Sequence, residues 1–100
     1  MGEQEGKAFY QLMFGYERAR VLIGFRCIGI AQAAYDAAFK YTQERVQFGR
    51  PIVEFQAVKH KLADMATDLA AARALAHSVA QTLDRGIRCN TEAGMVKLFC

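Results

Sequence analysis

The residues best suited to bind an anion or a polar cofactor lie in one short connection, ERVQFGRPIVEFQ, residues 44–56. Arg45 and Gln47 offer a guanidinium and an amide where a long helical segment is expected to end, and Gln56 opens the next one. Because a guanidinium binds phosphate oxygens through paired hydrogen bonds, this group suits a phosphate or a polar cofactor edge. From spacing alone a structural interpretation is favoured, in which Arg45 neutralises the negative helix end and Phe48 packs the loop onto the core.

A second group of charged residues lies in the segment YERAR, residues 16–20. Glu17 precedes Arg20 by three residues, so the spacing predicts a local ion pair on one helix face. A carboxylate that faces a pocket can also act as a general base. The structural ion pair is the favoured interpretation.

The rest of the chain carries no complete catalytic or metal-binding motif. Cys27, Cys89 and Cys100 lack a CxxC or Cys/His spacing and are expected to be free thiols. No Ser/His/Asp set, glycine-rich phosphate loop or HExxH motif is present, and His60 and His77 are interpreted as surface residues. The net charge of +3 is small and the basic residues are scattered, which argues against nucleic-acid binding.

Helices must position these residues, because alanine and long straight side chains dominate and Pro51 is the only proline. Gly49 and Pro51 impose a turn, Gly86 suits a left-handed helix end, and Asn90 suits a helix N-cap. The predicted organisation is one domain over residues 1–100, with a leading loop at 1–6, a helix at 7–44, a turn at 45–53, a helix at 54–85 and the start of a third helix at 90–100.

Apolar side chains recur at steps of three and four along both long helices, which predicts the faces that pack. The second helix has one stripe without a miss: Phe55, Val58, Leu62, Met65, Leu69, Ala72, Ala76, Val79 and Leu83. The first helix has the stripe Phe9, Leu12, Tyr16, Ala19, Ile23, Cys27, Ile30, Ala34 and Tyr41, thickened by Leu22, Phe25 and Ile28. The first helix is therefore expected to have neighbours on more than one side, with Gly24 and Gly29 permitting close helix approach.

The length of the first helix predicts that this chain completes its core with other segments. A helix of nearly forty residues is roughly 60 Å long, whereas a compact domain of this size has a radius of gyration near ~13 Å. We therefore expect a piece of a larger protein or a protomer of an oligomer. The most apolar run is interrupted by Arg26 and is shorter than the roughly 20 residues that a membrane span needs, so it is interpreted as a buried helix.

The run GIAQAAYDAAFKYTQERVQFGRPIVEFQAVKHKLADMATDLAAARALAHSVAQTLDRG, followed by AGMVKLFC, resembles the C-terminal helical domain of the acyl-CoA dehydrogenase family. Its most specific stretches are ERVQFGRPIVEFQ and KLADMAT. GEQEGKAFYQLMFGYERARV looks like the passage from the family's middle β-domain into the first helix of this domain. The resemblance implies an all-α fold: two full helices and the start of a third from an up-and-down four-helix bundle of long antiparallel helices.

The resemblance also implies the chemistry of the parent protein. Family members are FAD-dependent enzymes that oxidise an acyl-CoA thioester between Cα and Cβ. The turn after the first helix reaches the FAD of a neighbouring subunit. Carried over residue by residue, this places Arg45 and Gln47 near the pyrophosphate, and Phe48, Phe55 and Gln56 near the ribose and adenine. Phe55 stands where some members have a histidine.

The first helix is implied to form part of the substrate site. Glu17 and Arg20 match positions that contact the CoA part of the substrate, and Tyr16, Ala19 and Ile23 match positions that line the acyl pocket. One subgroup places its catalytic glutamate at the position of Ala19, which cannot accept a proton. Most members use a carboxylate farther downstream, so no catalytic residue is assigned in this chain and the isolated segment is expected to be inactive.

The implied partners are an acyl-CoA substrate, other subunits of a homodimer or homotetramer, and an electron-transfer flavoprotein or similar acceptor. The implied location is the bacterial cytoplasm or the mitochondrial matrix. Two alternatives stay open: an acyl-CoA oxidase or nitroalkane-oxidase-like flavoprotein with the same domain, and a non-catalytic helical interaction module in which the turn is only structural.

Overall fold

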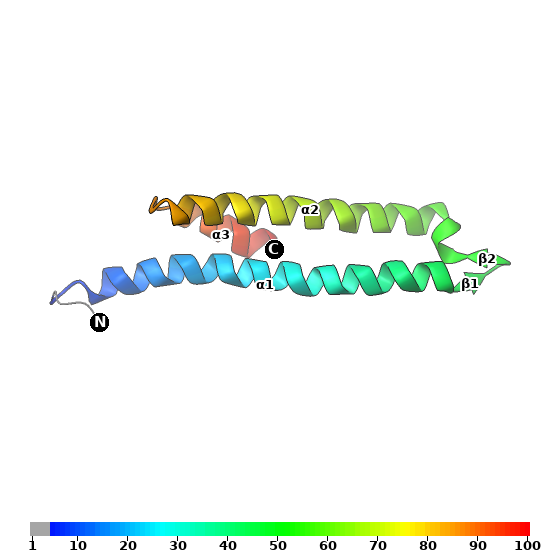
Figure 1. Cartoon of the computed structure of the whole chain (residues 1–100), viewed down its shortest axis with the longest axis horizontal. Helices are drawn as coiled ribbons and strands as arrows, with labels where there is room; N and C mark the ends of the chain where they lie inside the picture. The colour runs from blue at the N-terminus through cyan, green and yellow to red at the C-terminus, as the bar shows by residue number, and fades with distance from the viewer. Residues whose placement is uncertain (1–4) are drawn as a thin grey trace.

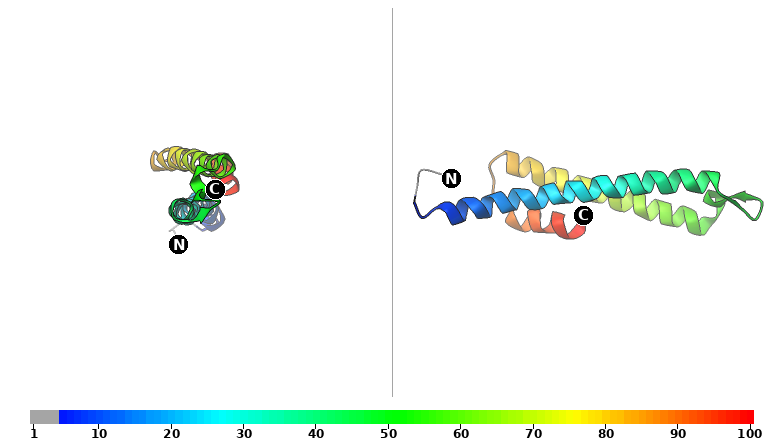
Figure 2. Two further views of the ribbon diagram at one scale, coloured as in Figure 1. Left: turned by 90° about the vertical axis from the view of Figure 1, so that its right-hand side faces the viewer. Right: turned by 90° about the horizontal axis from the view of Figure 1, so that it is seen from below.

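The structure, a computed structural model, describes residues 5–100 and is built almost entirely from helices (Figure 1). The two long helices lie antiparallel and α3 folds back beside them (Figure 2). The all-α fold expected from the sequence is confirmed. The elements in chain order are α1 (Ala8–Glu44), β1 (Val46–Gln47), β2 (Arg50–Pro51), a 3-10 turn η1 (Ile52–Glu54), α2 (Gln56–Asp84) and α3 (Asn90–Phe99).

The helix ends follow the local sequence closely. Helix α2 begins at Gln56, two residues later than predicted, because Ile52–Glu54 form the 3-10 turn that follows Pro51. It ends at Asp84, and Gly86, two residues later, has a φ of 75° that allows its N–H to bond Leu83 O at 2.9 Å. The predicted left-handed helix end is confirmed. Residues 1–4 of the predicted leading loop lie outside the described residues.

The apolar stripe predicted for α2 faces the core. Its members Leu62, Leu69, Ala72, Ala76, Val79 and Leu83 are buried, while Met65 at the edge is 38% exposed. They pack with α1 and with Ala93 and Val96 of α3. Because α2 is apolar on one side and polar on the other, its sequence had only one face to bury.

Within this chain the stripe predicted for α1 is mostly uncovered, although Ile28 of the predicted set is buried and Phe25 packs against the core. Most of its large members are exposed, for example Tyr16 at 51% and Ile30 at 72%. The face of α1 that α2 and α3 cover instead contains Glu17, Val21, Gly24, Ile28 and Thr42. Since α1 is apolar nearly all round, periodicity alone could not choose between its faces.

Gly24 is the point of closest approach between α1 and α3. A methyl group added at Gly24 would fall on Val96 Cγ1 and lie 3.7 Å from Cys100 Cβ. The expected role of Gly24 in helix approach is therefore confirmed. A methyl group at Gly29 would meet nothing within 4 Å, so the same expectation for Gly29 is wrong for the contacts within this chain.

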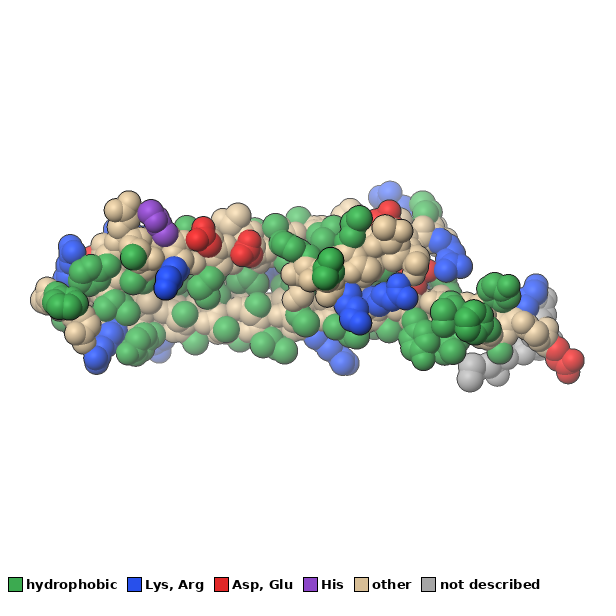
Figure 3. All heavy atoms as spheres, turned by 180° about the vertical axis from the view of Figure 1, so that it is seen from behind, with side chains coloured by type: hydrophobic (Ala, Val, Ile, Leu, Met, Phe, Trp, Pro, Cys, Tyr) green, Lys and Arg blue, Asp and Glu red, His purple; other side chains and the backbone are tan. Residues whose placement is uncertain are grey.

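The molecule is long and thin, with extents of 71 × 19 × 17 Å and a radius of gyration of 19.4 Å. Hydrophobic side chains are spread over the face shown in Figure 3. By length and composition α1 could cross a membrane, although a core helix of a soluble protein passes the same test. Only 17% of its most apolar stretch is buried, so the expectation of a buried helix does not hold within this chain.

Candidate functional site

The turn between the long helices is a small β-hairpin at one tip of the molecule (Figure 1). Its antiparallel register pairs Val46 with Pro51 and Gln47 with Arg50. The two residues at the tip, Phe48 and Gly49, have φ values of 53° and 81°. Two consecutive positive φ values are the requirement of a type I′ turn, which matches the twist of the flanking strands. The predicted turn is present, but its hairpin form was not predicted.

Phe48 is held in an unfavourable conformation with little packing to justify it. It is 92% exposed, and its ring meets the edge of Phe55 at a centroid distance of 6.1 Å. The Arg50 guanidinium lies 4.3 Å from the centroid of the same Phe55 ring. The interpretation that Phe48 packs the loop onto the core is therefore wrong. A bulky residue at positive φ costs free energy, and such residues concentrate at functional sites.

The polar groups of the hairpin have few partners of their own. Arg45 caps α1, with its backbone N–H donating to Tyr41 O at 2.9 Å. Arg45 and Gln47 are exposed, and within residues 5–100 neither side chain has a hydrogen bond or an ion pair. Gln56 Nε2 lies 3.5 Å from His60 Nε2. In extended chain, alternate residues share a face, which places Arg45 and Gln47 on the same side.

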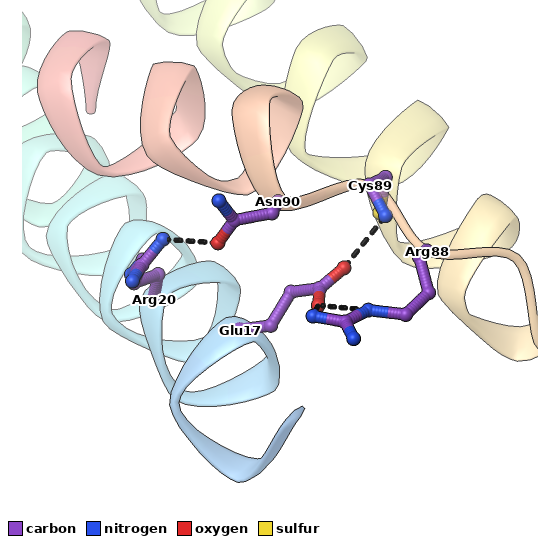
Figure 4. A network of polar contacts seen from close by, with 5 residues as sticks. All are labelled: Glu17, Arg20, Arg88, Cys89 and Asn90. Atoms are coloured by element: carbon purple, nitrogen blue, oxygen red, sulfur yellow. Dashed lines mark hydrogen bonds and ion pairs between the residues drawn. The ribbon is translucent and has the colours of Figure 1, made fainter. Parts of the chain in front are cut away.

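A second polar site joins the beginning of α1 to the connection between α2 and α3 (Figure 4). The Glu17 carboxylate is fully buried and both of its oxygens are bonded. Oε1 accepts the Cys89 backbone N–H at 2.6 Å, and Oε2 accepts from Arg88 at 3.2 Å for Nε and 3.1 Å for Nη2. Two bonds to a guanidinium and one to a backbone amide stabilise the buried charge.

The predicted local pair between Glu17 and Arg20 is absent, because both side chains have partners from the distant connection. Arg20 Nη1 donates to Asn90 Oδ1 at 2.7 Å. Asn90 is the first residue of α3, as predicted, but the N-cap position is Cys89 and has no side-chain cap. Glu17 satisfies a different group at this helix end, because it accepts the backbone N–H of Cys89 itself from across the fold.

Two of the three free cysteines have perturbed thiols. Burial raises the pKa of Cys89, and the nearby carboxylates of Glu17 and Glu92 raise it further. Burial also raises the pKa of Cys100, with a smaller effect from Cys27. A raised pKa keeps a thiol protonated and unreactive. Neither thiol is therefore suited to act as a thiolate nucleophile.

The predicted substrate residues do not share one environment. Tyr16 and Ile23 are exposed and Ala19 and Arg20 are half-buried, so this surface of α1 is accessible. Glu17 is buried with both oxygens engaged, which argues against direct contact with a substrate. The hairpin and this surface lie at opposite ends of α1, and at 1.5 Å per residue the 25 residues from Arg20 to Arg45 span about 37 Å.

Sequence reasoning missed the contribution of the connection before α3. Arg88, 60% exposed, pairs with Glu17 and lies 5.9 Å from the Phe14 ring centroid, while Arg18 lies 4.6 Å from the same ring. Glu17 and Arg88 are separated by 71 positions. No local spacing signals a contact between such distant residues.

Comparisons with known proteins agree on one domain type. The family model described as "Acyl-CoA dehydrogenase, C-terminal domain" matches residues 6–100. (2S)-methylsuccinyl-CoA dehydrogenase of Cereibacter sphaeroides is 45% identical over 99% of this chain, and acryloyl-CoA reductase (NADH) of Anaerotignum propionicum is 44% identical over 95% of it. The structure of butyryl-CoA dehydrogenase from Megasphaera elsdenii matches 96% of the chain with a TM-score of 0.92 and 35% identity.

These matches cover only part of each relative. The chain spans 18% of the length of the methylsuccinyl-CoA dehydrogenase, 24% of the acryloyl-CoA reductase and 25% of the butyryl-CoA dehydrogenase chain.

Proposed function

Because the chain belongs to the acyl-CoA dehydrogenase family through its C-terminal helical domain, we propose that it works as part of an FAD-dependent enzyme that dehydrogenates an acyl-CoA thioester between Cα and Cβ. Three roles fall to this domain: a wall of the acyl pocket, a contact to FAD bound mainly by a neighbouring subunit, and packing between subunits.

The hairpin fits the FAD role. Within residues 5–100 the donors of Arg45 and Gln47 have no side-chain partner, and they lie on one side of an extended segment. A guanidinium beside a diphosphate is a strong charge-assisted pairing. Phe48 is exposed at positive φ, and its ring can pack on a ribose or an adenine. Phe55 lies against this ring, and Gln56 is the next residue in the chain. This combination of an exposed cation, an exposed amide and an exposed aromatic ring on one hairpin is the observation that carries the proposal.

The distance along α1 supports a contact between subunits. A hairpin about 37 Å from Arg20 cannot touch the acyl group that lies against the same helix. An extended dinucleotide is shorter than this span. The hairpin of one subunit therefore contacts the flavin that reacts at the acyl pocket of another subunit.

Tyr16, Ala19 and Ile23 form the pocket wall, and Arg20 meets the CoA part of the substrate. When bound, FAD supplies the acceptor for the hydride that leaves Cβ. The residues of this chain orient the thioester and exclude water beside it. None of them removes the α proton, because Ala19 has no titratable group and both oxygens of Glu17 are already bonded. The carboxylate that removes the α proton belongs to another segment of the enzyme.

The proposed partners are the acyl-CoA substrate, the other subunits of a homodimer or homotetramer and an electron-transfer flavoprotein. Relatives from bacteria and from mitochondria are compatible with the bacterial cytoplasm or the mitochondrial matrix. The similarity to an acryloyl-CoA reductase favours a second candidate function, in which the same site reduces an α,β-unsaturated thioester to the saturated one.

The test is turnover by the complete flavoenzyme that carries this domain. With acyl-CoA thioesters of several chain lengths and an artificial electron acceptor, we expect an α,β-unsaturated product and bleaching of the flavin absorbance. Rapid re-oxidation by oxygen would favour an acyl-CoA oxidase instead. No flavin reduction by any thioester in either direction would contradict the proposal and favour a non-catalytic helical module.

A further inference from the structure

Arg20, which the proposed function places beside the CoA part of the substrate, is held by the first residue of a different helix. Its Nη1 donates a 2.7 Å hydrogen bond to Asn90 Oδ1, across 70 positions of sequence. In the described part of the chain Arg20 has no other side-chain partner. The direction of its guanidinium is therefore fixed by one acceptor.

Asn90 can fix the direction of the Arg20 side chain because the backbone around Asn90 is itself fixed by contacts with α1. The N–H of Cys89, the residue before Asn90, donates to Glu17 Oε1 at 2.6 Å, and Arg88 forms an ion pair with Glu17 Oε2. Glu17 lies on α1 one turn before Arg20, so the two contacts between α1 and residues 88–90 lie side by side (Figure 4). This arrangement fixes the start of α3 against the helix turn that bears Arg20.

The Asn90 side chain is not used as a helix cap. Asn90 is the first residue of α3 and the N-cap position is Cys89, so the asparagine preference for the N-cap does not apply to Asn90. Glu17 accepts the Cys89 N–H from across the fold, and the Asn90 side chain accepts a hydrogen bond from Arg20.

We propose that Asn90 is a positioning residue for acyl-CoA binding: its amide oxygen orients the Arg20 guanidinium toward the CoA part of the substrate. The inference rests on the proposed function of Arg20. An arginine has many rotamers, and ordering such a side chain on binding weakens affinity. Asn90 orders Arg20 before the substrate arrives, so its effect belongs to substrate binding and not to the chemical step.

Steady-state kinetics of the complete enzyme test this role. Asn90→Ala removes the acceptor, and we expect KM for acyl-CoA to rise about 5-fold, as for loss of one hydrogen bond, with kcat within about 2-fold. Asn90→Asp keeps an oxygen at the same place and should leave KM within about 2-fold of wild type. Thr91→Ala, at the exposed next position of α3, is the matched control and should change neither constant.

A double-mutant cycle separates positioning from a general structural effect. Arg20→Ala should raise KM by itself, and Asn90→Ala should then raise it no further. If Asn90→Ala does not yield folded enzyme, Asn90→Ser serves in its place, because a serine suits a helix start but its hydroxyl is too short to reach Arg20.

Several results would overturn the inference: an unchanged KM in Asn90→Ala, an equal rise in Asn90→Asp, or a full rise on top of Arg20→Ala. If Arg20→Ala itself leaves KM unchanged, the proposed substrate role of Arg20 is wrong and the inference falls with it. The two failures are thus distinguished by the Arg20→Ala variant.

Discussion

A buried carboxylate is the residue on which the beginning of this domain depends. Glu17 is fully buried, caps the start of α3 through the Cys89 N–H and pairs with Arg88. Removing the carboxylate leaves the buried Cys89 N–H without a partner, and removing Arg88 leaves the buried Glu17 charge without its counter-ion; either change is destabilising. Its role follows from burial and bonding and does not require a ligand.

Glu17→Gln should lower the free energy of unfolding by about 1.5–3 kcal/mol, because the uncharged amide turns a donor toward Arg88 or toward the Cys89 N–H. Glu44→Gln is the control: Glu44 pairs with Lys40 at 3.9 Å on an exposed surface, and its loss should cost less than about 0.5 kcal/mol. Urea unfolding of both variants measures the difference. Equal effects would show that the buried network does not stabilise the fold.

At the scale of elements, the accuracy of the prediction depended on whether the apolar side chains of each helix lie on one side only. The buried face of α2 was predicted well from Leu62 to Leu83, apart from the exposed Met65, because the opposite side of the helix is polar. Of the buried face of α1 only Gly24 and Ile28 were predicted, because apolar side chains surround this helix. The turn was predicted from Gly49 and Pro51, yet the hairpin depends on positive φ at Phe48, a residue that gives no such signal. The contacts of Glu17 and Arg20 join residues about 70 positions apart, which no local pattern encodes.

The two glycines of α1 provide a matched test of helix packing. Gly24→Ala places a methyl group on Val96 and should destabilise the domain by about 1–3 kcal/mol. Gly29→Ala meets open space and should stabilise the isolated chain by about 0.5–1 kcal/mol through helix propensity. Thermal unfolding of both variants gives the comparison. Destabilisation by both would mean that another segment lies against Gly29.

The hairpin tip allows stability and cofactor binding to be separated. In Phe48→Asn, relief of positive-φ strain of about 1 kcal/mol offsets the lost aromatic contact with Phe55, so stability should change by less than about 0.5 kcal/mol. FAD affinity of the complete enzyme should fall, because the exposed ring is gone. Urea unfolding and FAD titration measure the two quantities. A stability loss above about 2 kcal/mol with unchanged FAD affinity would make Phe48 a structural residue.

At the scale of the whole molecule, the domain is too extended to bury its own apolar surface. Its radius of gyration of 19.4 Å compares with about 13 Å for a compact chain of this length. Large side chains such as Phe9, Ile30 and Leu98 are 65%, 72% and 89% exposed. This many exposed large apolar side chains indicates that other segments or subunits cover part of the surface.

Residues 1–100 expressed alone should therefore self-associate. We expect size-exclusion chromatography with light scattering to give a mass above one chain, and a hydrophobic fluorescent dye to bind. A monodisperse monomer that does not bind the dye would contradict the view that α1 requires further partners. Turnover of acyl-CoA by this segment with added FAD would contradict its expected inactivity.

The central claim is that the hairpin contributes a cationic contact to FAD, and FAD dissociation from the complete enzyme tests it most directly. Arg45→Ala should raise the Kd for FAD about 10-fold or more, as for loss of a charge-assisted hydrogen bond. Arg85→Ala is the matched control, because Arg85 is likewise the exposed residue that caps a long helix, and its Kd should stay within about 2-fold of wild type. An unchanged Kd in Arg45→Ala, or an equal rise in both variants, would contradict the account.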